Sequence, residues 1–163
     1  MQSKNRGMIL ENIMNKTIKF YEDNDIGVFH KKNLDVQFSK VSSNNELKNA
    51  VISKKSTVDY YGVHKGIFVC FEAKSTNETN LPWQNIKEHQ FNYLKKIHKH
   101  GGLAFFIILF KNLERFFILP IQKLDEYKNE GSLSLNFIEQ NSIEMELMFP
   151  GIIDFVSVID SLF

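Results

Sequence analysis

Apolar side chains recur at helical spacing near the start of the chain, and this predicts a first helix over residues 5–24. Gly27, which follows Asn24 and Asp25, offers a stop for this helix. A second stripe predicts a helix over residues 84–99, and the glycine pair at 101–102 would end it. The first stripe consists of Gly7, Leu10, Met14, Ile18 and Tyr21, and the second of Ile86, Gln90, Tyr93, Leu94 and Ile97.

Short runs of alternating or continuous apolar residues predict the strands. The run GIFVCFEA at 66–73 is apolar and aromatic, as in a central buried strand, and LAFFIILF at 103–110 is apolar throughout. The preceding run at 56–61 is separated from 66–73 by a turn that contains glycine, which favours a hairpin. The remaining expected strands cover residues 27–31, 34–41 and 115–119.

Polar segments and a closing apolar segment complete the pattern. Residues 42–55 are polar and lack a strong period, which favours an excursion from the core, and residues 75–85 are expected to form a loop. Pro120 suits the first turn of a helix over 121–128 because a helix leaves that N–H unpaired. Residues 131–150 are expected to be irregular, and 153–163 to form a closing helix. Together these elements predict one α/β domain with a central mixed sheet flanked by helices.

Composition narrows the class of protein. The chain has 163 residues, of which 43% are hydrophobic and 24% charged, so an ordinary globular domain with a real core is expected. The one cysteine, Cys70, excludes an intrachain disulfide and a cysteine-based zinc cluster. The longest apolar run is far shorter than the roughly 20 residues that span a bilayer. No targeting segment is visible, and a cytoplasmic protein is expected.

The net charge of +1 hides two unlike parts. Residues 1–100 carry 16 Lys and Arg against 10 Asp and Glu, whereas residues 101–163 carry 4 against 9. A near-neutral total would argue against a nucleic-acid-binding protein, but the basic first part removes this objection.

The candidate chemistry lies between Asp59 and Lys74. In the sequence FEAK, Glu72 and Lys74 would share one face of a strand because side chains alternate, and a hairpin would bring Asp59 alongside Glu72. Paired carboxylates attract Mg²⁺ or Mn²⁺, and a neighbouring lysine can orient water and balance charge on an attacked phosphate. The pattern is that of many phosphodiesterases. A cross-strand ion pair at a solvated edge is the alternative.

Two further polar residues fall on apolar stripes. Gln90 lies on the inner face of the second predicted helix, where it either positions water or metal or is a hydrogen-bonded buried amide. Glu11 shares the stripe of the first helix, so its carboxylate either faces the sheet and its cation or reaches to water at the helix edge. Basic candidates for phosphate contacts are Arg6, Lys31 and Lys32, although single surface lysines are usually only solvated.

These residues occur in segments that strongly resemble the RecU family of Holliday junction resolvases. The segments are, in order, NRGMILE, VFHKK, STVDYYGVHKGIFVCFEAK, LPWQNIKEHQ and IDFVSVID. The block from STVDYYG to HQ is the most specific. The resemblance runs from about residue 4 to the C-terminus.

The resemblance implies a homodimeric endonuclease of the PD-(D/E)xK fold group that cuts four-way DNA junctions with Mg²⁺ or Mn²⁺. By motif, Asp59 and Glu72 would be metal ligands, Lys74 the catalytic lysine, Gln90 a further ligand and Glu11 the helix acid that faces the site. Arg6 matches the family's N-terminal arginine. A stalk that enters the open junction would fall at about residues 36–56, and its DNA-binding candidates are Lys48, Lys54 and Lys55.

The chain also departs from the family pattern. Cys70 stands where another acid is expected two residues before Glu72, which leaves the number of metal ions open, and the expected stalk is short and polar. The leading hypothesis is therefore a metal-dependent junction resolvase, with the strand-exchange recombinase as a further partner and no membrane association. The alternatives are a catalytically weak DNA-binding or recombinase-interacting module of the same fold, and a nuclease that cuts linear duplex.

Overall fold

The computed structural model describes residues 8–54, 57–125, 127 and 131–162. Its centre is a six-stranded sheet with the strand order β1-β6-β7-β9-β10-β12. The pair β7 and β9 is parallel and the other neighbours are antiparallel, so the sheet is mixed. These strands are β1 (Val28–Lys31), β6 (Tyr60–His64), β7 (Ile67–Thr76), β9 (Leu103–Phe110), β10 (Arg115–Pro120) and β12 (Ile143–Met145).

Helices cover both faces of this sheet. One apolar core joins α1 (Met8–Asp23) and α4 (Phe155–Leu162) to the face that carries Phe71 and Phe105. A second core joins α2 (Glu88–Lys99) and α3 (Leu135–Asn141) to the opposite face, which carries Phe106. The expected α/β architecture, a central mixed sheet between helices, is confirmed. Strand β9 is buried along its whole length, as its continuous apolar run predicts.

Several expected elements are confirmed with shifted ends. The first helix, β7 and the closing helix are present. The strand expected at 56–61 is displaced along the chain: β6 runs from Tyr60 to His64, Gly62 pairs with Val69 inside the sheet, and the turn is formed by residues 65–66. The second helix begins at Glu88 instead of residue 84, because Trp83–Asn85 form a separate 3-10 turn, η1, and Lys87 is extended. Within the expected loop at 75–85, β7 continues to Thr76, and β8 (Asn80–Pro82) pairs with β11 (Ser132–Ser134).

Two expectations about the second half of the chain are wrong. Pro120 ends strand β10 with extended backbone angles, and only a short 3-10 turn, η3 (Ile121–Leu124), follows it. Residues 131–150 are also more regular than expected, since they contain β11, α3, β12 and β13 (Leu147–Met148). Helix α3 begins at a side-chain cap, in which Ser134 Oγ accepts a hydrogen bond from the Phe137 N–H at 3.1 Å. Strand β13 pairs with β14 (Ile152–Ile153).

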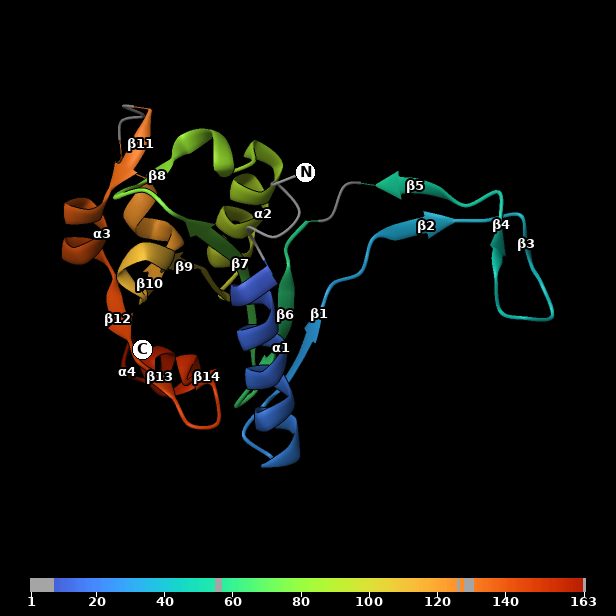
Figure 1. Cartoon of the computed structure of the whole chain (residues 1–163), viewed down its shortest axis with the longest axis horizontal. Helices are drawn as coiled ribbons and strands as arrows, with labels where there is room; N and C mark the ends of the chain where they lie inside the picture. The colour runs from blue at the N-terminus through green and yellow to red at the C-terminus, as the bar shows by residue number, and fades with distance from the viewer. Residues whose placement is uncertain (1–7, 55–56, 126, 128–130, 163) are drawn as a thin grey trace.

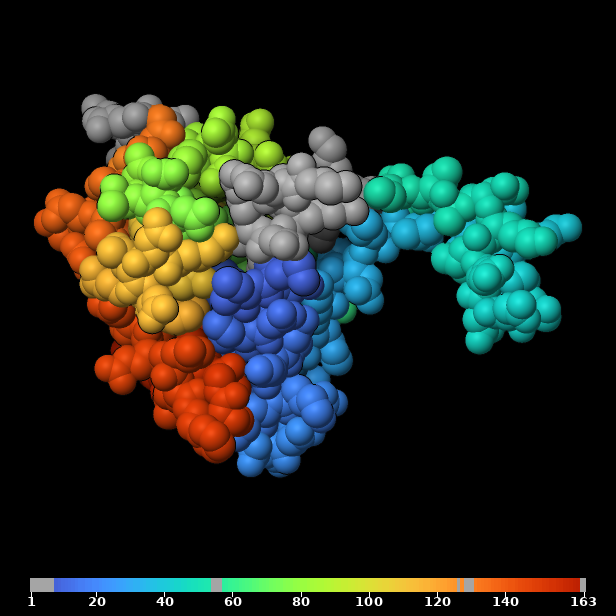
Figure 2. Space-filling model, in the orientation of Figure 1, coloured from blue at the N-terminus to red at the C-terminus, as the bar shows by residue number. Residues whose placement is uncertain are grey.

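Residues 35–54 extend away from the sheet as a narrow antiparallel ribbon (Figure 1). The inner part pairs β2 (Asp35–Gln37) with β5 (Val51–Lys54), and the outer part pairs β3 (Lys40–Val41) with β4 (Leu47–Lys48). In the space-filling view this ribbon stands clear of the body of the molecule (Figure 2). It carries exposed apolar side chains, among them Phe38 and Ile52.

Within the described residues, no helix is both long and apolar enough to cross a membrane.

Candidate active site

The hairpin of β6 and β7 brings Asp59 beside Glu72. The two strands pair with Tyr60 opposite Phe71. Asp59, which directly precedes β6, therefore lies opposite Glu72 on β7. The Asp59 side chain is fixed there, because its Oδ2 accepts a hydrogen bond from the Ala73 N–H at 3.0 Å. Local turn formation and strand alternation are therefore sufficient to place the two carboxylates together.

Glu72, Lys74 and Gln90 meet on the α2 side of the sheet. Lys74 Nζ lies 3.1 Å from Glu72 Oε2 and donates a second hydrogen bond to Gln90 Oε1 at 2.9 Å. Glu72 is fully buried, and Gln90 is only 8% exposed. Helix α2 thus points an amide oxygen at the strand lysine, so Gln90 is hydrogen-bonded and contacts the site at the same time. Its part as a metal ligand stays a prediction.

The buried Glu72 carboxylate and the partly exposed Asp59 carboxylate create an unfavourable charge arrangement. Burial, reinforced by the nearby Asp59 carboxylate, raises the pKa of Glu72 from its ordinary value to about 8, and Lys74 only partly offsets this. Moreover, Glu72 Oε1 is buried without a hydrogen-bond partner among the described residues. A buried, unpartnered carboxylate oxygen next to a second carboxylate is an arrangement that a hard cation would relieve.

The residues present fit a divalent metal ion, although they form a minimal set. The described residues contain no cluster of three or more His, Cys, Asp and Glu side chains that could hold a metal. A cation held by Asp59 and Glu72 would therefore need its remaining oxygen ligands from water, substrate or an amide. Mg²⁺ usually binds in this way, through one or two carboxylates with several waters retained.

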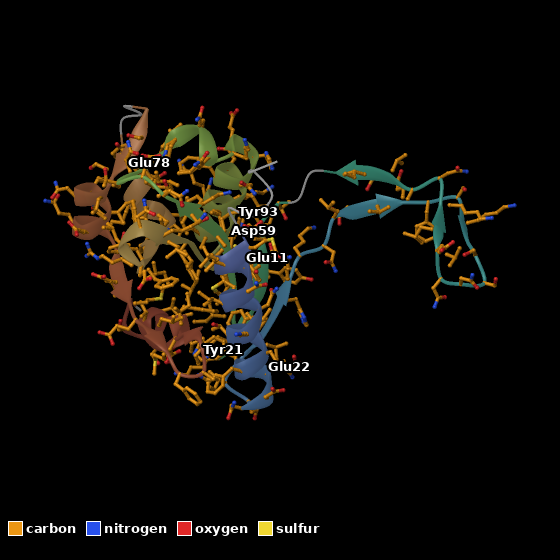
Figure 3. All side chains as sticks on the ribbon, viewed as in Figure 1. Glu11, Tyr21, Glu22, Asp59, Glu78 and Tyr93 are labelled. Carbon is orange, nitrogen blue, oxygen red and sulfur yellow. The ribbon has the colours of Figure 1, made fainter. Side chains whose placement is uncertain are left out.

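On the other face of β7, Glu11 approaches the same site from α1. A cavity of about 100 Å³ is lined by Glu11, Asp59 and Lys31, among other residues. Figure 3 shows Glu11 and Asp59 close together near the upper end of α1. Glu11 is about half-exposed and accepts a hydrogen bond from Lys31, so it lies at the rim of the site and is neither buried nor isolated.

The basic candidates do not gather in one place. Lys31 is paired with Glu11, and Lys32 Nζ lies 3.3 Å from Asp35 Oδ2. Lys48 is exposed on β4 in the projecting ribbon. Arg6 and Lys55 lie outside the described residues, and Lys54 is described only as a backbone position at the end of β5.

Cys70 lies two residues before Glu72 on the same face of β7. It packs into the core on the α2 side of the sheet. It is fully buried, and burial together with the Glu72 charge raises the pKa of its thiol to about 12. A neutral buried thiol supplies no metal ligand, so this position contributes packing to the core. His89 on α2 is exposed, as expected of a surface histidine.

A larger groove beside Lys74 is not evident from the sequence. It has a volume of about 500 Å³ and is formed by residues that follow the site residues along β7 and by three other segments. Its lining consists of Ala73, Lys74, Ser75, Thr76, Asn77, Glu78, Pro82, Gln84, Asn85, Lys87 and Lys111. The lysine and amide residues in these segments could have indicated a phosphate-binding surface. Their segments are far apart in the chain, however, so the sequence does not show that they meet.

Comparison with known proteins gives a consistent result along the whole chain. The family model described as RecU, recombination protein U, matches residues 5–161. A protein of Mycoplasmopsis pulmonis (strain UAB CTIP) named Holliday junction resolvase RecU is 43% identical over 162 residues, which cover 99% of this chain and 98% of the relative. The protein of the same name from Bacillus subtilis (strain 168) is 35% identical over 170 residues, which cover 98% of this chain and 82% of that protein.

A comparison of structures adds information about the fold. The crystal structure of Hjc from Archaeoglobus fulgidus, a Holliday junction resolvase from an archaeal hyperthermophile, superimposes with a TM-score of 0.51. The match covers 82% of this chain and 94% of the other, at 11% sequence identity. At this identity the likeness concerns the fold, and it is independent of the sequence matches.

Proposed function

The chain belongs to the RecU family, and on this premise we propose that it is a nuclease that resolves four-way DNA junctions during recombination and repair. The observation that carries the proposal is the meeting of Asp59, Glu72 and Lys74 at one end of the β6–β7 hairpin. The relatives that match almost the whole of this chain bear the name of junction resolvases. The fold likeness to an archaeal resolvase is consistent with this assignment.

We propose Mg²⁺, with Mn²⁺ as a substitute, as the cofactor. Asp59 and Glu72 would hold the ion, and the buried Glu72 Oε1 supports this because it has no hydrogen-bond partner among the described residues. When bound, such an ion supplies Lewis-acid stabilisation of the charge on the attacked phosphate. Gln90 and Glu11 are proposed as further contributors at opposite faces of β7.

The chain's own residues have distinct parts in the hydrolysis. Lys74 is held between Glu72 and Gln90, so its ammonium group is fixed in position and can orient water and stabilise negative charge on a phosphate oxygen. Burial of Glu72 excludes bulk water from this side of the site and strengthens its electrostatic interactions. The hydrogen bond from the Ala73 N–H keeps the Asp59 carboxylate turned toward β7.

A homodimer is the second part of the proposal, because symmetric cleavage of a junction requires two active sites. The α2-side face of β1, β6 and β7 is apolar and exposed, with Val28 51%, Tyr61 37%, Val63 48% and Phe68 36% accessible. Val63 lies opposite both Val28 and Phe68 in the strand register, so these side chains form a continuous surface. A second copy of the chain would cover it.

The proposal extends to the setting in which the protein acts. Binding to the strand-exchange recombinase and a location in the cytoplasm, where the junctions are formed and cut, belong to this function. The ribbon of residues 35–54 would contact the centre of the junction, with Lys48 near the phosphates.

The function is tested by the choice of substrate. Purified protein is incubated with Mg²⁺ and either a mobile four-way junction or a linear duplex of the same sequence. We expect paired symmetric nicks in the junction and little cutting of the duplex. Comparable cutting of both would indicate a general nuclease, and binding without nicking in Mg²⁺ or Mn²⁺ would indicate a non-catalytic module.

A further inference from the structure

The groove of about 500 Å³ shares Lys74 with the site described above and extends from it along the end of β7. Four segments form it: the end of β7, the turn that follows, the stretch from Pro82 to Lys87, and Lys111 after β9. Amide and ammonium groups dominate its polar lining. Such groups are the usual hydrogen-bond donors to a phosphodiester backbone.

The groove wall is held in place by hydrogen bonds within the protein. In the turn after β7, Thr76 Oγ1 donates to the Asn80 carbonyl at 3.0 Å and accepts from the Glu78 N–H at 3.0 Å. From the neighbouring segment, Asn112 Nδ2 donates to the Asn77 carbonyl at 2.6 Å. The turn is therefore tied to itself and to the segment after β9, which favours a preformed surface.

The position of the groove relates it directly to the carboxylates. Strand β6 pairs with β7 only up to Phe71, so β7 from Glu72 onward has β9 as its partner in the described sheet. Ala73 and Ser75 line both the small cavity next to Asp59 and the larger groove. A DNA strand that passes from one hollow to the other would cross β7 at the residues that carry the proposed chemistry.

The charges of the groove suit a polyanion. Lys87 and Lys111 line it, and neither takes part in an ion pair with another described residue. Lys87 Nζ contacts only a neutral acceptor, the Gln84 carbonyl at 3.5 Å. Glu78 is the one acidic residue among the lining residues that the structure describes.

Resting on the proposed function, we infer that this groove binds the sugar-phosphate backbone of the cut DNA strand next to the scissile phosphate. Lys87 and Lys111 neutralise phosphates there, and Glu78 opposes them. This gives the molecule a backbone contact on the body of the fold, separate from the projecting ribbon. It also assigns a role to two lysines that the active-site geometry does not use.

Three substitutions test the inference, two that make the groove less positive and one that makes it more positive. Lys87→Gln and Lys111→Gln each remove one positive charge from the groove, whereas Glu78→Gln removes the negative one. Lys99→Gln is the matched control, because Lys99 is exposed at the opposite end of α2. The dissociation constant of a fluorescently labelled four-way junction is measured by anisotropy in EDTA, so that no cleavage occurs, over a series of KCl concentrations.

We expect each groove lysine variant to bind the junction more weakly, by roughly threefold or more, and to lower the salt slope by about one. Glu78→Gln should bind more tightly than wild type, and Lys99→Gln should equal it. If wild type binds and cuts the junction but all four variants retain its affinity and salt slope, the groove inference is overturned and the proposed function stands. If wild type neither binds nor cuts the junction, both are overturned.

Discussion

Glu72 holds a charge that the metal-free fold tolerates poorly. Its pKa is raised to about 8, so between its ordinary value and pH 8 the folded state binds a proton that the unfolded state releases. Stability contributed through this group therefore falls as the pH rises through that window, and a bound cation would reverse the effect. The same residue is thus expected to link stability to pH and to metal.

The corresponding prediction concerns Glu72→Gln in EDTA. At pH 9 the variant should have a higher free energy of unfolding than wild type, by on the order of a few kcal/mol, since one pKa unit corresponds to about 1.4 kcal/mol. The advantage should shrink toward pH 5. Urea unfolding at the two pH values measures this, and a loss of stability that is equal at both would contradict it.

The same unfolding experiment is repeated with added Mg²⁺ in place of EDTA. Added Mg²⁺ should raise the unfolding free energy of wild type and leave Glu72→Gln nearly unchanged, because ligands that bind only the native state stabilise it by mass action. Equal stabilisation of both proteins would place the cation elsewhere.

The sequence was sufficient to place the residues of the site that depend on local geometry. Strand alternation puts Glu72 and Lys74 on one face, and a short hairpin brings Asp59 beside them. The groove residues could not be predicted in this way. Asn77 and Asn112 meet only because β9 lies parallel to β7 with Thr76 opposite Phe110, and this register is set by the packing of distant segments.

At the scale of elements, the strands and the longer helices follow from their apolar periods, whereas α3 does not. Only Ile138 of this short helix is buried, so it lacks an apolar stripe, and its one local signal is the Ser134 cap. The late start of the second helix, at Glu88 instead of residue 84, has another cause: the 3-10 turn at Trp83–Asn85 and the extended Lys87 precede the helix.

The exposed apolar face of β1, β6 and β7 leads to a prediction about formation of the dimer. Val63→Lys places a charge in the centre of this face, and we expect the dissociation constant of the dimer to rise about 30-fold or more. Val63 is 48% exposed, so the fold itself should persist. Sedimentation equilibrium measures the change, and Leu113→Lys, at a similarly exposed position outside this face, is the control.

If Val63→Lys and Leu113→Lys assemble like wild type, the second copy does not bind on this face. A monomeric wild type at all accessible concentrations would remove the dimer from the proposal altogether.

The ribbon of residues 35–54 makes a separate prediction. Its apolar side chains are exposed, and β2 and β5 already pair at Gln37 and Val51. Replacing residues 38–50 with an Asn-Gly turn should therefore close the ribbon and change the unfolding free energy by less than about 0.5 kcal/mol. Junction binding should weaken much more than binding to linear duplex. Equal losses on both substrates would contradict a role in junction recognition.

At the scale of the whole molecule, the basic and acidic parts of the chain lie on different sides of the structure. Residues 1–100, with their excess of Lys and Arg, form α1, the projecting ribbon, β7 and α2. The acidic C-terminal part gathers on the side of the body away from the ribbon (Figure 1). There Arg115 pairs with Glu139 and Glu144, so part of the acidity is neutralised internally. DNA is therefore expected to contact the basic N-terminal part, which includes the ribbon, β7 and Lys87.

The central claim is that Asp59 and Glu72 perform metal-dependent cleavage of a junction that the rest of the molecule binds. The most direct measurement is single-turnover cleavage of a four-way junction in Mg²⁺, together with junction binding in EDTA, for wild type and Glu72→Gln. Glu22→Gln is the matched control, because Glu22 is exposed and lies at the opposite end of α1 from Glu11 and Asp59 (Figure 3).

We predict that Glu72→Gln lowers the cleavage rate by roughly 100-fold or more and leaves the dissociation constant of the junction within about threefold of wild type. Glu22→Gln should cut at the wild-type rate. A Glu72→Gln variant that cuts like wild type, or one that loses binding and folding together with cleavage, would contradict the account.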